Sequence, residues 1–225
     1  MTAIAPLHFD DAREAAGLAA FLRRLLHYDR AAAVRLQAGG GAVAVFGRPP
    51  SFEVLAIRTA RLVDAVDLDV TVSAGELLEG IEESAGKAVV PDTVTGPPWA
   101  GVLPPRGGWE PVAGLPPVTE MRGAVAAAVT EFRGRDEALP EERRTRAERD
   151  RIGREIWSRT LAGTGLPLRA VHAAQSLGFL PPLPDEELPV ALFASGPWLR
   201  LRTPYGSIAL RTVPMPLSVA PGAAR

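Results

Sequence analysis

The fold is decided by the stretch VRLQAGGGAVAVFGRPPSFEVLAIRT, which runs from Val34 to Thr59. A related stretch, VALFASGPWLRLRTPYGSIALRT, runs from Val190 to Thr212 and is three residues shorter. In both, apolar residues alternate with other residues, and Gly or Pro interrupts the alternation. This is the pattern of strands joined by turns, because strand side chains point alternately to opposite faces. Each stretch predicts a three-stranded meander.

The two stretches align over their whole length. The anchors are Val34, Leu36, Ala38, Gly40, Ala56, Arg58 and Thr59, which match Val190, Leu192, Ala194, Gly196, Ala209, Arg211 and Thr212. Such a match arises either by duplication or by convergence, since any two meanders in an alanine- and valine-rich chain look alike. We expect an α+β protein of two related antiparallel three-stranded meander units with helices, joined by a Pro/Gly-rich arm and a helical segment.

The first meander is predicted to be apolar on both faces. If the register follows the alternation, one face carries Val34, Leu36, Val43, Val45, Leu55 and Ile57, and the other carries Ala44, Phe46, Val54 and Ala56. A helix before the meander can cover only one of these faces. We therefore expect a second covering element, for which a second subunit is one candidate.

The second meander is predicted to carry arginines on one face. Leu199, Leu201, Ile208 and Leu210 share one face, which leaves Arg200, Arg202 and Arg211 on the other beside Phe193. Guanidinium groups and an aromatic ring on an antiparallel sheet can hold phosphates and stack a base. The alternative is that these arginines form the solvated face of a sheet that packs on one side only.

Helical spacing and capping signals predict the remaining elements. A helix is expected from Asp10 or Asp11 to about Tyr28, a strand over 68–73, and further helices over 75–84, 118–133, 141–161 and 168–177. The stretch 89–117 is rich in Pro and Gly, but it also contains Trp99 and Trp109. Disordered linkers seldom carry tryptophan, so we expect an ordered arm that packs these rings on the core or on a partner.

These elements divide the chain into three parts. We expect an N-terminal meander unit at 1–88, the arm at 89–117, and a helical segment with the second meander at 118–215. The charge is balanced, with 25 Lys and Arg against 26 Asp and Glu, which argues against binding to nucleic acid mainly by counterion release. There is no cysteine, which excludes disulfides and thiolate metal sites. No signal-peptide pattern and no apolar run of roughly 18 residues is present, so we expect a cytoplasmic protein outside the membrane.

Few residues suggest catalysis, and we expect no catalytic site, metal or cofactor. His8, His27 and His172 lack metal-ligand spacing, and Gly39, Gly40 and Gly41 join two strands rather than a strand and a helix. Asp67 and Asp69 would share one face of a strand and offer hard oxygen ligands to a divalent cation. The alternative for this pair is a solvated strand start.

The last helix and the hairpin after it also fit a winged-helix arrangement. In that hypothesis the helix at 168–177 enters a groove of DNA, and Pro204, Tyr205 and Gly206 form the tip of the wing. Only Arg169, His172, Gln175 and Ser176 would then face the groove.

Two resemblances extend this picture. The segments PPWAGVLPPRGGWEPV (97–112), EIWSR (155–159), HAAQSLGFL (172–180) and GPWLRLRTPYGSIALR (196–211) resemble an uncharacterised family of actinobacterial proteins. The order APLHF, first helix and first meander is similar to one β-α-β-β-β unit of a DNA sliding clamp, and VTVSAGELLEGI (70–81) looks like the opening of another. The stretch 97–180 has no counterpart in a clamp.

We therefore expect a non-catalytic binding or scaffold protein that self-associates as a homodimer or larger homo-oligomer. Its partner-binding residues are predicted to be Arg200, Arg202, Arg211, Phe193, Trp99 and Trp109. One alternative is a DNA-binding regulator or clamp-like DNA-associated protein that uses the C-terminal helix and hairpin. A second alternative is a metal-dependent enzyme at Asp67 and Asp69.

Overall fold

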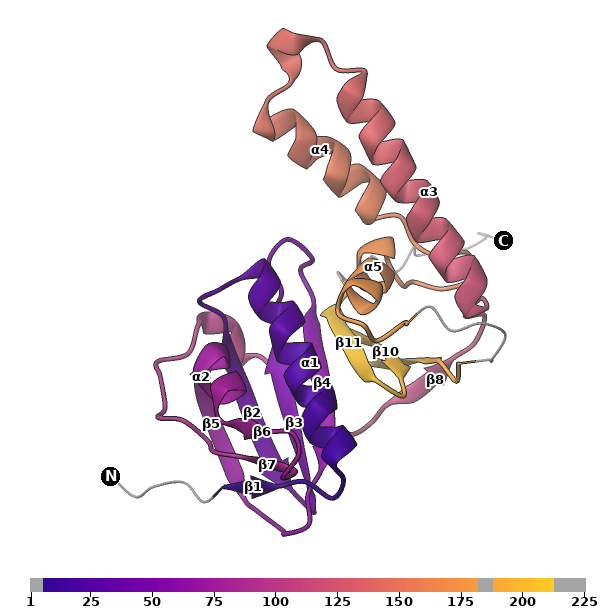
Figure 1. Ribbon diagram of the computed structural model, residues 1–225. Coiled ribbons are helices and arrows are strands. Elements are labelled where there is room, and N and C mark those ends of the chain that lie inside the picture. Colours follow the sequence, from indigo (N-terminus) through magenta and orange to yellow (C-terminus); the bar gives the residue numbers. More distant parts are fainter. Residues whose placement is uncertain (1–5, 182–187, 213–225) are drawn as a thin grey trace, which may run out of the picture.

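Both predicted meanders are present and lie in one antiparallel sheet (Figure 1). The computed structural model describes residues 6–181 and 188–212. The first meander is β2 (Ala33–Gly39), β3 (Ala42–Gly47) and β4 (Leu55–Arg61), and the second is β9 (Ala191–Ser195), β10 (Trp198–Thr203) and β11 (Gly206–Arg211). Strand β4 pairs with β11, which gives an eight-stranded sheet of order β5-β2-β3-β4-β11-β10-β9-β8. The α+β class with two related meanders is confirmed.

The other elements surround this sheet. They are β1 (Leu7–His8), α1 (Ala12–Tyr28), β5 (Leu68–Ser73), α2 (Ala74–Glu79), β6 (Ile81–Glu82), β7 (Lys87–Ala88), β8 (Glu110–Val112), α3 (Val118–Glu137), α4 (Arg146–Trp157) and α5 (Leu168–Ser176). Single 3₁₀ turns lie at Pro98–Gly101 and Glu141–Arg143, and β1, β7 and β6 form a small second sheet. None of the helices in the described part of the chain combines the length and apolar character needed to cross a membrane.

Several helix boundaries differ from the prediction by four or five residues, and capping residues account for two of them. Helix α4 begins at Arg146 rather than near Glu141, because the Thr145 side chain accepts a hydrogen bond from the Glu148 backbone N–H. This Thr-x-x-Glu pattern is a capping signal that fixes the start of a helix. Helix α2 ends at Glu79, five residues before the predicted end, with Gly80 as its C-cap.

The pairing between β4 and β11 relates the two meanders by an approximate two-fold axis. Leu55 and Ala56 correspond in the aligned stretches to Ile208 and Ala209. In the sheet Ala56 pairs with Ile208, and Leu55 pairs with Ala209. Each pair becomes the other when the two units are exchanged, which is the arrangement of an isologous dimer interface. The chain thus makes internally the contact that two identical subunits would make.

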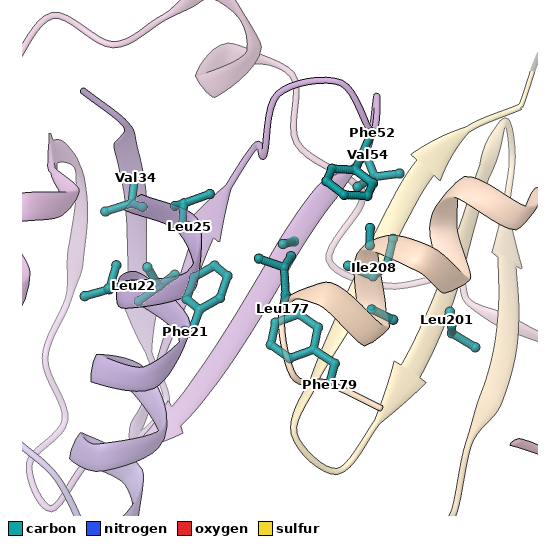
Figure 2. Close-up of a cluster of buried hydrophobic side chains, with 14 of the residues drawn as sticks. Phe21, Leu22, Leu25, Val34, Phe52, Val54, Leu177, Phe179, Leu201 and Ile208 are labelled. Carbon is teal, nitrogen blue, oxygen red and sulfur yellow. The ribbon is translucent and has the colours of Figure 1, made fainter. Parts of the chain in front are cut away.

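One face of the sheet, called here the helix face, is covered by α1 and α5 (Figure 1). Where the two units meet, the ring of Phe179 stacks on that of Phe21 with a centroid separation of 5.6 Å (Figure 2). A Cβ at Gly206, whose φ is +155°, would lie 2.6 Å from the Phe179 ring. Only glycine therefore lets the β10–β11 hairpin approach this closely.

A partly buried arginine of the first unit also reaches across the junction of the two units. Arg58 on β4 contacts Glu14 of α1 at 3.2 Å, and its Nη1 donates to the backbone carbonyl of Tyr205 at 3.0 Å. Burial lowers the pKa of the Arg58 guanidinium below its usual value, and Glu14 opposes that effect. One side chain thus ties the helix of the first unit to the hairpin of the second.

The first meander is apolar on both faces, as predicted, but the predicted register of β4 is wrong. Val54 and Ala56 join the core under the helices, whereas Leu55 and Ile57 lie on the opposite face with Phe46. The reason is the long β3–β4 connection, in which Ser51 and Glu53 adopt positive φ and shift the alternation by one residue.

The arm, residues 89–117, covers this opposite face, called here the arm face. Trp99, Leu103 and Trp109 pack against a buried cluster of Phe46, Leu55, Ile57, Trp198 and Ala209. The arm then enters the sheet itself, because β8 pairs with β9 at the edge. The predicted second covering element is therefore the chain's own arm.

Helices α3 and α4 form a hairpin that extends away from the sheet (Figure 1). Ion pairs between the helices join it: Arg135 donates to Glu155 at 2.7 and 2.8 Å, and Arg159 donates to Glu131. Arg135 lowers the pKa of Glu155 to about 2. Within α4 the ion pair between Arg151 and Glu155, four residues apart, is longer, at 3.7 Å.

We predict that Phe179→Ala lowers the free energy of unfolding by about 3–5 kcal/mol, because it removes a ring that is only 2% exposed at the junction of the two units. Chemical denaturation followed by circular dichroism measures this. Tyr205→Ala is the matched control: its side chain is 41% exposed, and we expect a change within about 0.5 kcal/mol. Equal losses in the two variants would contradict the described junction.

Candidate functional site

A pocket of about 690 Å³ opens on the arm face where β4, β11, β10 and β9 lie side by side. It is lined by Arg58, Thr59, Trp109, Pro189, Val190, Ala191, Phe193, Arg200, Arg202, Thr203, Pro204, Gly206 and Ser207. We call it the arginine pocket. The first unit contributes Arg58 and Thr59, and the arm contributes Trp109, so the pocket exists only because the two units share one sheet.

Arg200 is the central cation of the pocket. It lies on β10 directly between Ala209 of β11 and Phe193 of β9, and its Nε donates to the Ser207 hydroxyl at 3.0 Å. Burial lowers the pKa of the Arg200 guanidinium, and the neighbouring charge of Arg202 lowers it further. No carboxylate within the described ranges forms an ion pair with Arg200. A half-buried cation beside a second cation is costly unless an anion compensates the two charges.

Trp109 forms an aromatic wall of the pocket. Its indole Nε1 donates to the Pro105 carbonyl at 3.0 Å, which fixes the plane of the ring. The Arg200 guanidinium lies 5.8 Å from the ring centroid, within the range of a cation–π contact. The arm therefore does two things at once: it covers the apolar part of the face and builds one side of the pocket.

The predicted partner-binding residues do not all come together. Arg200, Arg202, Phe193 and Trp109 line the arginine pocket, whereas Arg211 and Trp99 are not among its lining residues. Arg211 pairs with Trp198 across β10 and β11 and lies over that ring at 5.9 Å. Trp99 packs in the cluster beneath the arm and lines a smaller pocket with Arg48 and Ser73.

Sequence reasoning missed Thr59 and Ser207, which bring hydroxyl groups to the pocket. Ser207 stands opposite Arg202 in the sheet and next to the junction, since it pairs with Ile57 of β4. The alternation in β11 places Ser207 on the same face as Ala209 and Arg211, which was a usable signal. The sequence carries no such signal for Thr59, because its position near Ser207 depends on the pairing of β4 with β11.

The helix proposed to read DNA is largely covered. Helix α5 buries Leu168, Ala170, Val171, Ala173 and Ala174 between the sheet and the α3–α4 hairpin. Of the four residues predicted to face a groove, Gln175 alone is exposed. Arg169 lies 3.8 Å from Glu53, and His172 stacks on Trp157 with a centroid separation of 4.4 Å.

The carboxylates at β5 are engaged by other side chains. Asp69 accepts hydrogen bonds from Arg35 at 2.8 Å and Gln37 at 3.2 Å, and the Arg35 hydrogen bond holds the pKa of Asp69 below its usual value. Asp67 is exposed next to it. Over residues 6–181 and 188–212, no three His, Cys, Asp or Glu side chains gather as metal ligands would.

Of the three histidines, His172 is the most enclosed. It is held between Trp157 of α4 and Phe52 of the β3–β4 connection, whose ring centroid is 5.2 Å away. Burial lowers the pKa of His172 below its usual value of 6.5. His8, in contrast, is exposed and lies 3.3 Å from Asp64.

We predict that His172 makes the protein less stable in acid. Because its pKa is lower in the folded than in the unfolded chain, its contribution is fully present above pH 6.5 and is lost as the pH falls toward the folded pKa. Denaturation at about pH 7.5 and about pH 5.5 measures the difference. His172→Gln should reduce this difference; an undiminished difference in His172→Gln would contradict the prediction.

Two family models match the chain, and both describe domains of unknown function. The first, DUF8010, matches residues 2–101, and the second, DUF8185, matches residues 104–215. The boundary between them lies within the arm, so each matched region contains one meander. No curated protein matches the chain. The arginine pocket thus lies where two regions with separate family models meet.

Proposed function

We propose that this is a non-catalytic binding protein and that the arginine pocket receives the anionic group of its ligand. The observation that carries the proposal is Arg200, a half-buried guanidinium beside Arg202. Among the described residues, the only hydrogen bond of the Arg200 side chain is the one from Nε to Ser207. The remaining N–H groups of Arg200 are available for an oxyanion, and a guanidinium can present two parallel donors to it.

The other lining residues support binding rather than chemistry. The described lining residues include no histidine and no carboxylate beside Thr59 or Ser207 that would activate a hydroxyl as a nucleophile. They supply donors on one side and apolar surface on the other. This combination, a mostly apolar cavity with a few convergent polar groups, is typical of ligand sites.

Self-association remains a prediction, but the observation that suggested it has another explanation. The apolar outer face of the first meander is covered by Trp99, Leu103 and Trp109 of the same chain. A homo-oligomer would have to use a different surface. The clamp-like and DNA-binding alternatives are less well supported than the pocket, because α5 is covered and Arg211 lies outside the pocket that holds Arg200 and Arg202.

The proposal predicts that anions stabilise the protein through Arg200 and Arg202. Inorganic phosphate, citrate and benzoate are added to the purified chain, and the melting temperature is followed. Each kcal/mol by which a bound anion increases the free energy of unfolding raises Tm by about 2–4 °C for a chain of this size. At least one anion should raise Tm in the parent chain.

Three matched variants assign the effect to the pocket. Arg200→Met should abolish the rise in Tm, and Arg202→Met should weaken anion binding about tenfold or more, as expected for a lost charge-assisted hydrogen bond. Arg211→Met, on the same face but outside the pocket, should bind as the parent does. Without anion, Arg200→Met should be at least as stable as the parent, because it removes a half-buried cation. No rise with any anion, or an equal loss in Arg211→Met, would overturn the proposal.

A further inference from the structure

The volume of the arginine pocket indicates a ligand larger than a simple ion. The pocket holds about 690 Å³, in the middle of the range of about 300–1,000 Å³ for small-molecule sites. A bare oxyanion at Arg200 would leave most of this volume unfilled. The ligand is therefore expected to carry a body that occupies the rest.

The walls indicate that this body is planar and largely apolar. Trp109 and Phe193 reach the pocket from the arm and from β9, and Pro189, Val190 and Pro204 complete the apolar lining. The Trp109 ring is fixed by its hydrogen bond to Pro105, so it presents a rigid surface. Aromatic side chains of this kind stack on planar rings, and each stacked base contributes about 1–3 kcal/mol in nucleic-acid complexes.

The polar end indicates a doubly charged head group. Two guanidinium groups, Arg200 and Arg202, project from alternate positions of one strand, and Ser207 and Thr59 add hydroxyl groups from two neighbouring strands. A phosphate monoester carries a charge of about −1.5 to −2 at pH 7 and three acceptor oxygens. A carboxylate offers one charge and two oxygens, and so would leave one of the two cations uncompensated.

We infer that the arginine pocket binds a phosphate monoester that a sugar links to a planar ring, which is the chemistry of a nucleoside monophosphate. The phosphate lies at Arg200 and Arg202 with Ser207, and the ring lies against Trp109 and Phe193. This inference rests on the proposed function and adds the class of ligand.

Two features favour a nucleoside monophosphate, one over an oligonucleotide and the other over a nucleoside triphosphate. Arg211, the third arginine on this face of the second meander, stands four residue levels from Arg202 and is engaged over the Trp198 ring, which packs in the cluster beneath the arm. A nucleic-acid strand that followed β10 would therefore meet the arm rather than a continuous row of cations. None of the described lining residues is acidic, so the pocket itself offers no carboxylate to a magnesium ion that would shield a triphosphate.

The test is isothermal titration calorimetry of the full chain with compounds that separate the head from the ring. Adenosine monophosphate and guanosine monophosphate are compared with adenosine, with ribose 5-phosphate, with benzoate and with a ten-residue thymidine oligonucleotide. The monophosphates should bind at least tenfold more tightly than the nucleoside and the sugar phosphate, and one nucleotide should bind per chain. Arg200→Met should lose binding, Trp109→Leu should lose the advantage of the monophosphates over ribose 5-phosphate, and Arg211→Met should bind as the parent does.

The outcomes separate this inference from the proposed function. If benzoate or ribose 5-phosphate binds as tightly as the monophosphates, through Arg200, the pocket binds anions but the ring and head-group assignment is overturned. If the oligonucleotide binds more tightly than the monophosphates, and Arg211→Met weakens it, the ligand is a single strand and the inference is also overturned. If no compound binds, both the inference and the proposed function fail.

Discussion

The rest of the structure depends on the pairing of β4 with β11. This short ladder, with Ile57 opposite Ser207, Ala56 opposite Ile208 and Leu55 opposite Ala209, converts two three-stranded meanders into one sheet. Without it each meander would keep an open central edge, and exposed edges are prone to pair with other chains. The same ladder brings α1 and α5 together on the helix face, where Phe21 stacks on Phe179 (Figure 2). It also brings Thr59 and Ser207 to the same pocket on the arm face.

The approximate two-fold symmetry makes plain how the two halves of the arm face differ. In the aligned meanders, Ala44 and Phe46 of β3 correspond to Arg200 and Arg202 of β10. The apolar pair lies beneath Trp99, Leu103 and Trp109 of the arm, which buries it as a core. The arginine pair lies at the margin of the arm, where only Trp109 reaches it. A sheet built from two similar halves thus has one half closed by its own chain and the other half with cations available to a ligand.

Much of this arrangement could be predicted from local sequence, and the rest depends on contacts between distant segments. The period-two pattern predicted all six meander strands, and the capping signal at Asp11 with the helical spacing of Leu18, Leu22 and Leu25 predicted α1. The faces of β10 and β11 were predicted correctly, because Gly196 and the 204–206 turn leave no room for a shift in register. The register of β4 was predicted wrongly, because the alternation of apolar residues gives no sign of the positive φ angles at Ser51 and Glu53. Arg200, Arg202, Phe193 and Trp109, predicted as partner-binding residues, line one pocket. Arg211 is separate from them because of where the arm lies, and Thr59 joins them only through the β4–β11 ladder.

The most direct test of the account is a cross-strand disulfide between β4 and β11. The chain has no cysteine, so Leu55→Cys with Ala209→Cys introduces the only two thiols. Residues directly opposite each other in an antiparallel sheet have Cα atoms about 4.5–5.5 Å apart, within the range of about 4.4–6.8 Å that a disulfide spans. Mild oxidation of the folded protein, read by mass spectrometry of the linked peptides, should give this disulfide in high yield. The offset pair Leu55→Cys with Ile208→Cys places the thiols on opposite faces and should stay reduced. If the offset pair oxidised as readily, or the direct pair did not oxidise at all, the continuous sheet and the pocket that it forms would both be contradicted.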